Sequence, residues 1–311
     1  MSTVLPTPAD VGAAAARVGG EVRRTPTLEL DGDEVGAPGV RVVLKLELLQ
    51  HTGSFKARGA LNSVATLGAG GPGVAAASGG NHGAAVAWAA QRVDLRADVF
   101  VPESATPAKL RRIRDYGGEL HLVDGDVGDA LEACREFSEK NEVPVVHPYD
   151  TWETVCGAGT LGGEIGEQVP DADLVMLACG GGGLYAGTAA ALSGRVPVQP
   201  VEPELCPQLH DALAAGGPVR RPSAGAAADS LGSPQIGRFA YETARRSTTG
   251  SVLVDEDAIL AARRFLWERV RLLGEPAAAT PMAALMTRRV TPEPGSTVVL
   301  VVSGGNNPSV P

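Results

Sequence analysis

The feature that most constrains the fold is a repeated alternation of short apolar segments and segments with the period of an α-helix. Many of the apolar segments end in glycine-rich loops, which is typical of buried strands. Strands that alternate with helices form parallel sheets, because each crossover returns the chain to the same end of the sheet. The sequence therefore predicts an α/β fold of open, mostly parallel sheets covered by helices.

The predicted elements cover most of the chain. Strands are predicted at residues 41–46, 74–77, 98–101, 119–123, 143–146, 174–178, 196–201 and 297–302. Helices are predicted at residues 11–18, 84–90, 107–116, 127–140, 184–192, 206–215, 255–273 and 281–289, and a further helix contains Lys56 in its first turn with Ser54 as N-cap. Residues 151–160 and 216–234 are interpreted as loops.

The composition argues against several classes of partner. The 311 residues include 44% apolar and 20% charged residues, which suits a buried core. A net charge of -9 without a long basic cluster argues against nucleic acid as the main partner. No apolar run is long enough to span a membrane and no secretory signal is present, so we expect a cytoplasmic protein with no membrane partner. The four cysteines lack metal spacing, and we expect buried free thiols.

A lysine at the start of a predicted helix is the first candidate for chemistry. Lys56 lies in the segment 52–60. The partial positive charge of a helix N-terminus disfavours an ammonium, so we expect a lowered pKa for Lys56. An amine with a lowered pKa can act as a base or form a Schiff base. From this segment alone, a solvated surface lysine is an equally good interpretation.

Three further loops follow predicted strands, where ligands bind in open parallel sheets. The first offers polar groups for a carboxylate or a phenolic oxygen, the second offers backbone N–H groups for a phosphate, and the third offers a hydroxyl. A structural turn is the alternative for each loop. The residues are Ser78, Gly79, Gly80, Asn81 and His82 in the first loop, Gly180, Gly181, Gly182 and Gly183 in the second, and Ser303 in the third.

The glycine run also allows a different cofactor. The run fits a relaxed dinucleotide fingerprint, and Glu202 ends the next predicted strand, where an acidic residue can bind a ribose. By spacing alone NAD binding is therefore an alternative. It leaves the Lys56 segment unexplained.

Taken together, four motifs resemble the serine/threonine dehydratase family of fold-type II enzymes that depend on pyridoxal 5'-phosphate (PLP). They are the segments 47–60, 78–83 and 180–183 and the terminal sequence Ser-Gly-Gly-Asn at 303–306. They occur in the family's order over nearly the whole chain, which disfavours NAD. The resemblance implies a tryptophan synthase β-like fold with a large cofactor-binding domain, residues 1–50 and 150–311, and a small domain, residues 51–149, inserted in it. It also implies a homodimer.

The resemblance assigns roles to individual residues. Lys56 would hold PLP as a Schiff base and later remove the α-proton of the substrate, and Phe55 would pack near the ring. Asn81 would bind the phenolic oxygen and Ser303 the pyridine nitrogen. The phosphate would bind Gly180, Gly181, Gly182 and Gly183, and the substrate carboxylate would bind Ser78, Gly79, Gly80, Asn81 and His82.

The implied activity is that of a PLP-dependent lyase. It would dehydrate L-threonine, L-serine or a related β-hydroxy amino acid to a 2-oxo acid and ammonia by β-elimination. A β-replacement synthase that uses the same aminoacrylate is the alternative, followed by a non-catalytic PLP-binding protein. The sequence does not define the preferred side chain of the substrate.

Some positions depart from the family or match it weakly. Gly79 stands where serine racemases of the family carry a second acid, so racemisation is disfavoured. Ala158 stands where the family usually has glutamine, which would alter the substrate pocket. Glu275 precedes a proline as in the family and is a candidate site-shaping residue, although an exposed loop glutamate is an equally good interpretation.

A cation is the second candidate cofactor. Some relatives bind one with a glutamate, a backbone carbonyl and a downstream carboxylate. Glu202 and Cys206 are the matching candidates here, but Gln208 replaces the last carboxylate. Loss of a carboxylate weakens a site for a hard cation.

Overall fold

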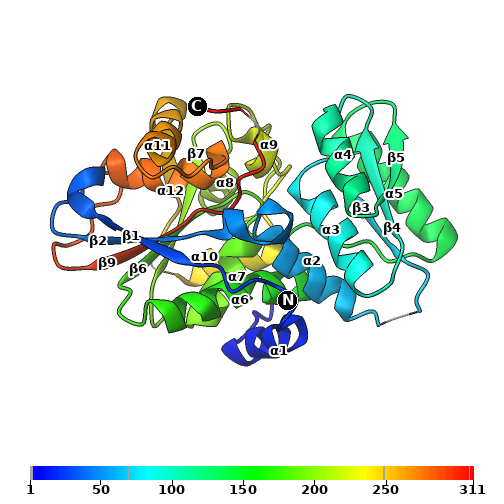
Figure 1. The fold of residues 1–311 in the computed structure, drawn as a ribbon, viewed down its shortest axis with the longest axis horizontal. Helices are drawn as coiled ribbons and strands as arrows, with labels where there is room; N and C mark the ends of the chain where they lie inside the picture. The colour runs from blue at the N-terminus through cyan, green and yellow to red at the C-terminus, as the bar shows by residue number, and fades with distance from the viewer. Residues whose placement is uncertain (1–2, 69, 248, 308) are drawn as a thin grey trace.

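The structure is a computed structural model that describes residues 3–68, 70–247, 249–307 and 309–311. Its described strands form a six-stranded sheet of order β1-β2-β9-β6-β7-β8 and a three-stranded sheet of order β3-β4-β5. The larger sheet lies in the left lobe of Figure 1 and the smaller sheet in the right lobe. Within the described ranges every strand pair is parallel except β1 with β2. The predicted fold class is confirmed.

The bounds of the elements are as follows. The strands are β1 (Thr27–Asp31), β2 (Arg41–Lys45), β3 (Val74–Ala77), β4 (Ala97–Pro102), β5 (Glu119–Val123), β6 (Leu174–Ala178), β7 (Val198–Pro203), β8 (Val252–Val254) and β9 (Thr297–Val301). The α-helices are α1 (Pro8–Val18), α2 (Lys56–Ala65), α3 (Asn81–Arg92), α4 (Pro107–Asp115), α5 (Val127–Asn141), α6 (Trp152–Gln168), α7 (Gly183–Leu192), α8 (Gln208–Ala215), α9 (Ala228–Leu231), α10 (Arg238–Arg246), α11 (Glu256–Glu268) and α12 (Pro276–Met286). The short 3-10 helices are η1 (Gly32–Val35), η2 (Glu47–Leu49) and η3 (His51–Gly53).

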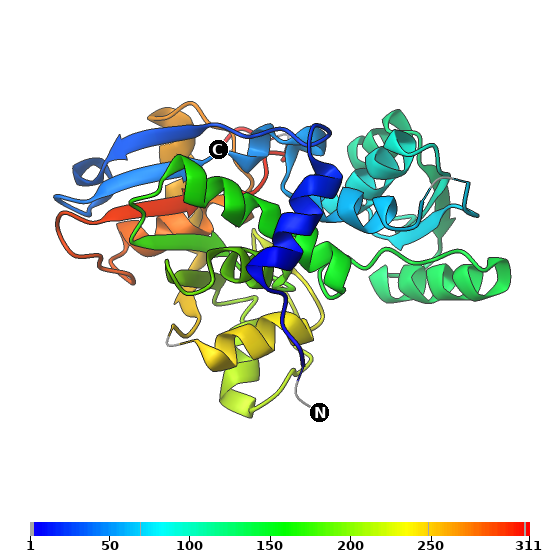
Figure 2. The same ribbon diagram turned by 90° about the horizontal axis from the view of Figure 1, so that it is seen from below.

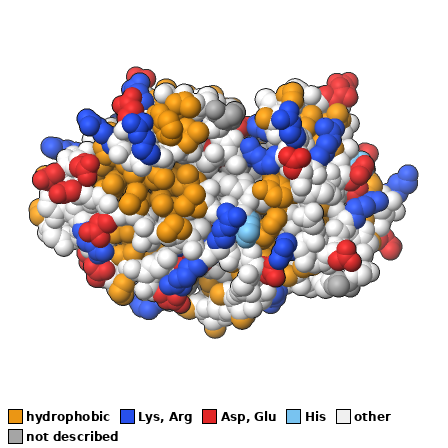
Figure 3. Space-filling view, viewed as in Figure 1, with side chains coloured by type: hydrophobic (Ala, Val, Ile, Leu, Met, Phe, Trp, Pro, Cys, Tyr) orange, Lys and Arg blue, Asp and Glu red, His pale blue; other side chains and the backbone are white. Residues whose placement is uncertain are grey.

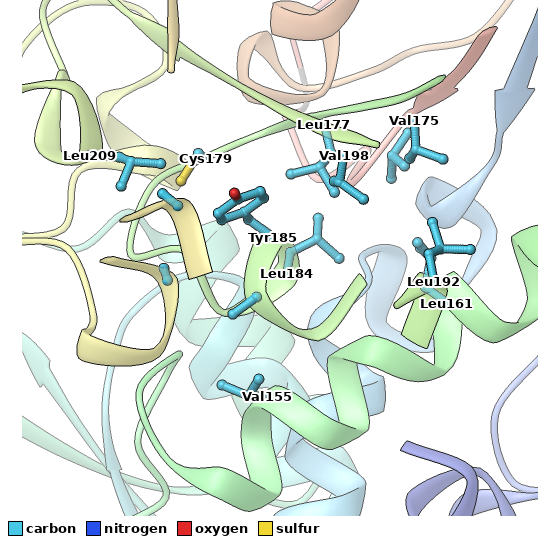
Figure 4. Close-up of a cluster of buried hydrophobic side chains, with 14 of the residues drawn as sticks. Val155, Leu161, Val175, Leu177, Cys179, Leu184, Tyr185, Leu192, Val198 and Leu209 are labelled. Atoms are coloured by element: carbon cyan, nitrogen blue, oxygen red, sulfur yellow. The ribbon is translucent and has the colours of Figure 1, made fainter. Parts of the chain in front are cut away.

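The large sheet is buried on both faces, and this explains its apolar central strands. Val299 of β9 belongs to the core under α6, α7 and α10, whereas Val298 and Leu300 belong to the core under α11 and α12. Side chains alternate across a strand, so a strand covered on both faces is apolar throughout. Figure 4 shows the first core, where Tyr185 and Leu184 of α7 face the sheet residues Leu177 and Val198. Figure 2 shows α1 crossing the lower side of the molecule, between the two lobes.

The loop predicted at residues 151–160 is wrong, because α6 begins at Trp152. Glycine has a low helix propensity, and the glycines of this segment hid the helix. Their role is close packing: a Cβ atom at Gly157 would lie 2.6 Å from the Cβ atom of Asn62 in α2, and one at Gly159 would lie 2.6 Å from the carbonyl oxygen of Gly187 in α7. The backbone of α6 therefore lies directly against both neighbouring helices.

The predicted strands differ from the observed ones at several places. Residues 143–146 form only an isolated bridge beside β3, where Ala75 N donates to Pro144 O at 2.9 Å. Pro144 lacks the N–H group that a continued ladder would need. Residues 27–31, where no strand is predicted, form the edge strand β1. Its apolar alternation is limited to Leu28 and Leu30 in a largely exposed, partly acidic segment, which is a weak signal for a strand. The two short elements β8 and α10 were missed as well.

No helix in the described ranges has the length and apolar character needed to cross a membrane. All four cysteines are free and buried, as expected. The predicted domain boundaries stay a prediction.

A buried ionic network ties α2 to the large lobe. The side chains of Arg58 and Glu47 are both fully buried, and Arg58 Nε donates to Glu47 Oε2 at 2.7 Å. Arg58 also donates to Glu164 of α6 at 2.7 Å, and Glu164 accepts a further hydrogen bond from Lys45 at 2.6 Å. Burial opposes the charge of Arg58, but the two carboxylates together raise its pKa. The network fixes the helix that carries Lys56.

We expect Glu47→Gln to destabilise the protein by about 3 kcal/mol, because it leaves a buried guanidinium with only one carboxylate. The measurement is the free energy of unfolding from a urea titration. The matched control is Glu167→Gln, which removes an exposed partner of Arg24 and should cost less than about 1 kcal/mol. Equal losses in the two variants would contradict this prediction.

Candidate active site

The predicted motif residues lie together between the two lobes. Lys56, His82 and Gly183 line one small cavity, together with Phe55 and Ala158. The segment before α2 also contacts the end of the chain, since Phe55 N donates to Ser303 O at 3.0 Å. The four motif segments, which are far apart in sequence, therefore meet at the carboxyl ends of the strands, as expected for an open parallel sheet.

Lys56 lies in the first turn of α2, as predicted, and is its first residue; its amine is partly desolvated. Lys56 Nζ donates to Pro148 O at 2.7 Å, and burial lowers the pKa of Lys56 to about 8. The direction agrees with the prediction, but desolvation is the main cause. The predicted N-cap is wrong: Phe55 occupies the N-cap position without a capping side chain, and Ser54 Oγ is buried without a hydrogen-bond partner in the part of the chain that the structure describes.

The glycine run begins α7 and exposes its backbone donors. Gly182 has a φ of 86°, a left-handed conformation that favours glycine. Within the described ranges, the four N–H groups of Gly180–Gly183 meet no hydrogen-bond acceptor. A Cβ atom at Gly181 would overlap the ring of Tyr149. Free N–H groups at a helix N-terminus suit an anionic group such as a phosphate.

Asn81 is part of a polar network and begins α3, so it does not lie in a loop as predicted. Asn81 Nδ2 lies 3.0 Å from both carboxylate oxygens of Glu275. Glu275 also accepts hydrogen bonds from Ser230 Oγ at 2.9 Å and from Asn306 N at 3.0 Å. Glu275 is 5% exposed, which disfavours the interpretation as an exposed loop residue. It joins the small lobe to the end of the chain.

Ser303 is buried, and its hydroxyl makes no hydrogen bond within the described part of the chain. The backbone carbonyl of Ser303 accepts a hydrogen bond from Phe55 N. The hydroxyl is therefore free to donate to, or accept from, a bound group. The aromatic ring of Phe55 lies 5.2 Å from Lys56 Nζ.

The segment predicted to bind the substrate carboxylate follows β3. Ser78 Oγ accepts a hydrogen bond from Gly80 N at 3.2 Å. A Cβ atom at Gly79 would lie 2.7 Å from Val101 Cγ1, so a serine there would require the buried Val101 to move. His82 is buried, and its Nε2 lies 2.8 Å from Val146 O. Burial is the main cause that lowers the pKa of His82 to about 3, so the imidazole is neutral.

Sequence reasoning did not assign three residues that the structure brings to the site. Asn306 belongs to the terminal motif, yet no separate role was predicted for it. Tyr149 packs against the glycine run, and Ser230 reaches Glu275 from the segment that was interpreted as a loop. The only sequence signals were the motif itself for Asn306 and the position of Tyr149 between two predicted elements.

Figure 3 shows a notch between the two lobes at the top of the molecule. Two basic side chains of α4 reach across it. Lys109 pairs with Asp229 of α9. Arg112 Nη2 donates to Asn306 O at 3.1 Å. The lobes are thus bridged by polar contacts at the mouth of the site.

The candidate cation residues have other partners. Glu202 accepts hydrogen bonds from Leu209 N, His210 N and Ser251 Oγ, and Cys206 Sγ donates to Ala224 O at 3.4 Å. No group of three or more histidine, cysteine or acidic side chains that could hold a metal ion occurs among the described residues. The cation site stays a prediction.

Comparison with known proteins now decides the family. Residues 18–304 match the model of the family described as pyridoxal-phosphate dependent enzyme. The chain belongs to this family. It is 36% identical over 310 residues to a phenylserine dehydratase of Ralstonia pickettii, which covers 98% of this chain and 94% of that relative. It is 38% identical over 273 residues to an L-threonine ammonia-lyase of Geobacter sulfurreducens, covering 86% of this chain and 68% of that one.

Solved structures of this PLP-dependent family have the same fold. A threonine deaminase from T.th. superposes with a TM-score of 0.90 at 34% identity, covering 98% of this chain and 100% of that one. A serine racemase of Dictyostelium discoideum has a TM-score of 0.88 at 30% identity, covering 97% of this chain and 99% of that one. The cofactor of this family is PLP, and the donors described above fit it: free N–H groups for a phosphate, an amine of lowered pKa and an unpaired serine hydroxyl.

We expect Gly181→Ala to abolish the visible absorbance that PLP gives when bound, because the added Cβ atom would overlap the Tyr149 ring beside the phosphate donors. The measurement is an absorbance titration with PLP. The control is Gly163→Ala in α6, where a Cβ atom meets nothing within 4 Å and where alanine should stabilise the helix by about 0.5–1 kcal/mol. Normal PLP binding by Gly181→Ala would contradict this prediction.

The lowered pKa of Lys56 predicts the pH dependence of its reactivity in the cofactor-free protein. Only the unprotonated amine is a nucleophile, and its fraction rises as the pH rises through the pKa, here about 8. Labelling of Lys56 by an amine-specific reagent should therefore reach half of its maximal rate near pH 8, whereas a lysine in a model peptide does so near about 10.4. The measurement is the labelling rate at a series of pH values, followed by mass spectrometry. A midpoint of the rate near that of the model peptide would contradict the lowered pKa of Lys56.

Proposed function

We propose that this protein is a PLP-dependent ammonia-lyase that dehydrates a β-hydroxy amino acid to a 2-oxo acid and ammonia. The observation that carries the proposal is the position of the Lys56 amine. It lies in one cavity with the start of α7, and burial lowers its pKa to about 8. Such an amine can bind a cofactor aldehyde and can also exchange a proton near neutral pH.

The roles that we propose for the chain follow from this geometry. The N–H groups of Gly180–Gly183 would bind the phosphate, Ser303 Oγ would bond to the ring nitrogen, and Asn81 would bond to the phenolic oxygen. When bound, PLP would supply an electron sink for negative charge on the α-carbon. Lys56 Nζ would accept the α-proton, and the β-hydroxyl would take up a proton and leave as water. The segment 78–82 holds the substrate carboxylate.

The class of substrate rests on the relatives. A phenylserine dehydratase, L-threonine ammonia-lyases and a serine racemase are among them. Phenylserine, threonine and serine share a β-hydroxyl group on an amino acid. We therefore propose L-threonine and L-serine as the first substrates to test and phenylserine as the third. A cytoplasmic location and a homodimer also stay predictions.

Elimination is proposed over racemisation because of Gly79. Racemisation needs an acid on the face of the α-carbon opposite to the lysine. Gly79 offers no hydroxyl, and the adjacent Val101 leaves little room for one. Gly79 bears on the second proton donor only, and the role of Lys56 is the same in both reactions.

We expect Lys56→Ala to lose both the visible absorbance of the covalently bound cofactor and at least a thousandfold of turnover, because it removes the Schiff-base amine and the base together. The measurements are absorbance spectra of the purified proteins and 2-oxo acid plus ammonia formed from L-threonine, L-serine and phenylserine. A wild-type protein that binds PLP yet forms a β-substituted product only when a thiol is added would favour a β-replacement synthase. An unchanged spectrum in Lys56→Ala would refute the assignment of the lysine.

A further inference from the structure

Asn306 lies at the point where four segments of the chain meet. Its side-chain Nδ2 donates to Thr52 O and to Asn81 Oδ1, both at 2.7 Å. Its backbone N donates to Glu275 Oε1 at 3.0 Å, and its backbone O accepts from Arg112 at 3.1 Å. These contacts join the segment before Lys56, both lobes and the end of the chain. None of the roles proposed for the cofactor and substrate involves Asn306.

The network fixes the orientation of the Asn81 amide. The carbonyl of Thr52 can only accept a hydrogen bond, so the group of Asn306 that faces it must be Nδ2. The same Nδ2 donates to Asn81, which must therefore present its oxygen to Asn306 and its nitrogen to Glu275. The Glu275 carboxylate can only accept hydrogen bonds, so it also requires that Asn81 turn its amide nitrogen toward it.

One N–H of Asn81 is left for a ligand. Asn81 Nδ2 carries two hydrogens, and it lies 3.0 Å from both oxygens of the Glu275 carboxylate. One hydrogen can serve these two oxygens together, and the other then remains unused. If the amide were reversed, Asn81 would present an acceptor oxygen both to Glu275 and to an incoming anionic oxygen.

Asn306 also holds a strained backbone. Thr52 has a φ of 60°, which is costly for a β-branched residue. Its buried Oγ1 has no hydrogen-bond partner in the described ranges, so the hydroxyl makes no bond that would offset the strain. The hydrogen bond from Asn306 to Thr52 O is one of the contacts that hold this conformation. Gly53, with a φ of 75°, allows the close approach, because a Cβ atom there would overlap Asn306 Oδ1. Strain of this kind is concentrated at functional sites.

We infer that Asn306 is a positioning residue: it sets the direction of the Asn81 amide so that an N–H points at the phenolic oxygen of PLP, and it holds Thr52 in the conformation that leads into Lys56. This inference rests on the proposed function, because it takes the phenolic oxygen to be the partner of Asn81. Asn306 itself touches neither the cofactor nor the substrate in this assignment.

The decisive variant is Asn306→Asp. It replaces a donor by a carboxylate oxygen close to two acceptors, Thr52 O and Asn81 Oδ1, and next to the Glu275 carboxylate. We expect PLP affinity at pH 8 to fall at least tenfold and the absorbance maximum of the bound cofactor to shift. The neighbouring acceptors and the Glu275 carboxylate should raise the pKa of the new carboxyl, whereas Arg112 on the backbone carbonyl opposes that shift. The loss relative to wild type at the same pH should therefore become smaller toward pH 6, because a protonated carboxyl can again donate one hydrogen bond. PLP titrations at several pH values measure all three effects.

The matched control is Asn307→Asp, which makes the same change of charge one residue along the chain. Asn307 Oδ1 only accepts hydrogen bonds, from Ser309 N and Ser309 Oγ, so a carboxylate can replace it. We expect Asn307→Asp to match wild type in PLP affinity and in the absorbance maximum. An equal loss in both variants would show a general effect of charge and would overturn the inference.

A second pair of variants separates amide orientation from backbone strain. Thr52→Gly removes the strain and the unpaired hydroxyl, so it should raise the free energy of unfolding of the cofactor-free protein in wild type and in Asn306→Ala. It should not restore PLP affinity to Asn306→Ala. Full restoration would mean that Asn306 acts only through Thr52 and would overturn the role assigned to Asn81.

The outcomes also distinguish this inference from the proposed function. If wild type binds PLP and forms a 2-oxo acid while Asn306→Asp is unchanged in affinity and absorbance, the inference fails and the proposed function stands. If wild type binds no PLP, the proposed function fails and the orientation role with it. Should Asn306→Asp not fold, Asn306→Ala gives the same readouts, with an expected loss of affinity of roughly threefold to tenfold that is independent of pH; an unchanged affinity would again overturn the inference.

Discussion

The buried ion pair between Arg58 and Glu47 is the interaction on which the rest of the site depends. Arg58 lies two residues after Lys56 in α2, and its planar guanidinium bonds to Glu47 with two nitrogens, both within 2.8 Å. A bidentate pair of this kind has a defined direction as well as a favourable energy. Glu164 of α6 accepts hydrogen bonds from the guanidinium as well, so the ion pairs tie the first turn of α2 to the large lobe. Lys56 lies on the same turn.

Glycine has two separate roles in this molecule. In α6 it lets helix backbones approach one another, as the close contacts at Gly157 and Gly159 show. At the start of α7 it leaves backbone N–H groups open to a ligand. The same residue type therefore provides dense packing beneath the candidate site and unobstructed backbone donors within it. Both roles depend on the missing side chain.

Much of the fold could be predicted because strands such as β6 and β9 are almost entirely apolar and are followed by glycine-rich loops. The family could be predicted because four motifs occur in its order along the chain, whereas the roles of Lys56, Asn81 and Ser303 stay proposals. Other features could not be predicted, for physical reasons: the glycines of α6 conceal a helix that tertiary packing stabilises, and β1 lies exposed at an edge. At Asn306 the polar network joins residues that lie far apart in sequence: Asn81 is 225 positions away and Thr52 is 254 positions away. No local sequence pattern encodes such a contact.

The bridge across the notch has a consequence for how the two lobes respond to salt. Lys109 and Asp229 are both partly exposed, with 27% and 66% of their side-chain surface accessible, and such ion pairs contribute at most about 1 kcal/mol. Both charged groups are already partly in contact with water, so this contact between α4 and α9 owes its strength to charge and not to hydrophobic burial. Its contribution therefore falls as the salt concentration rises, while the apolar cores of the two lobes are screened much less.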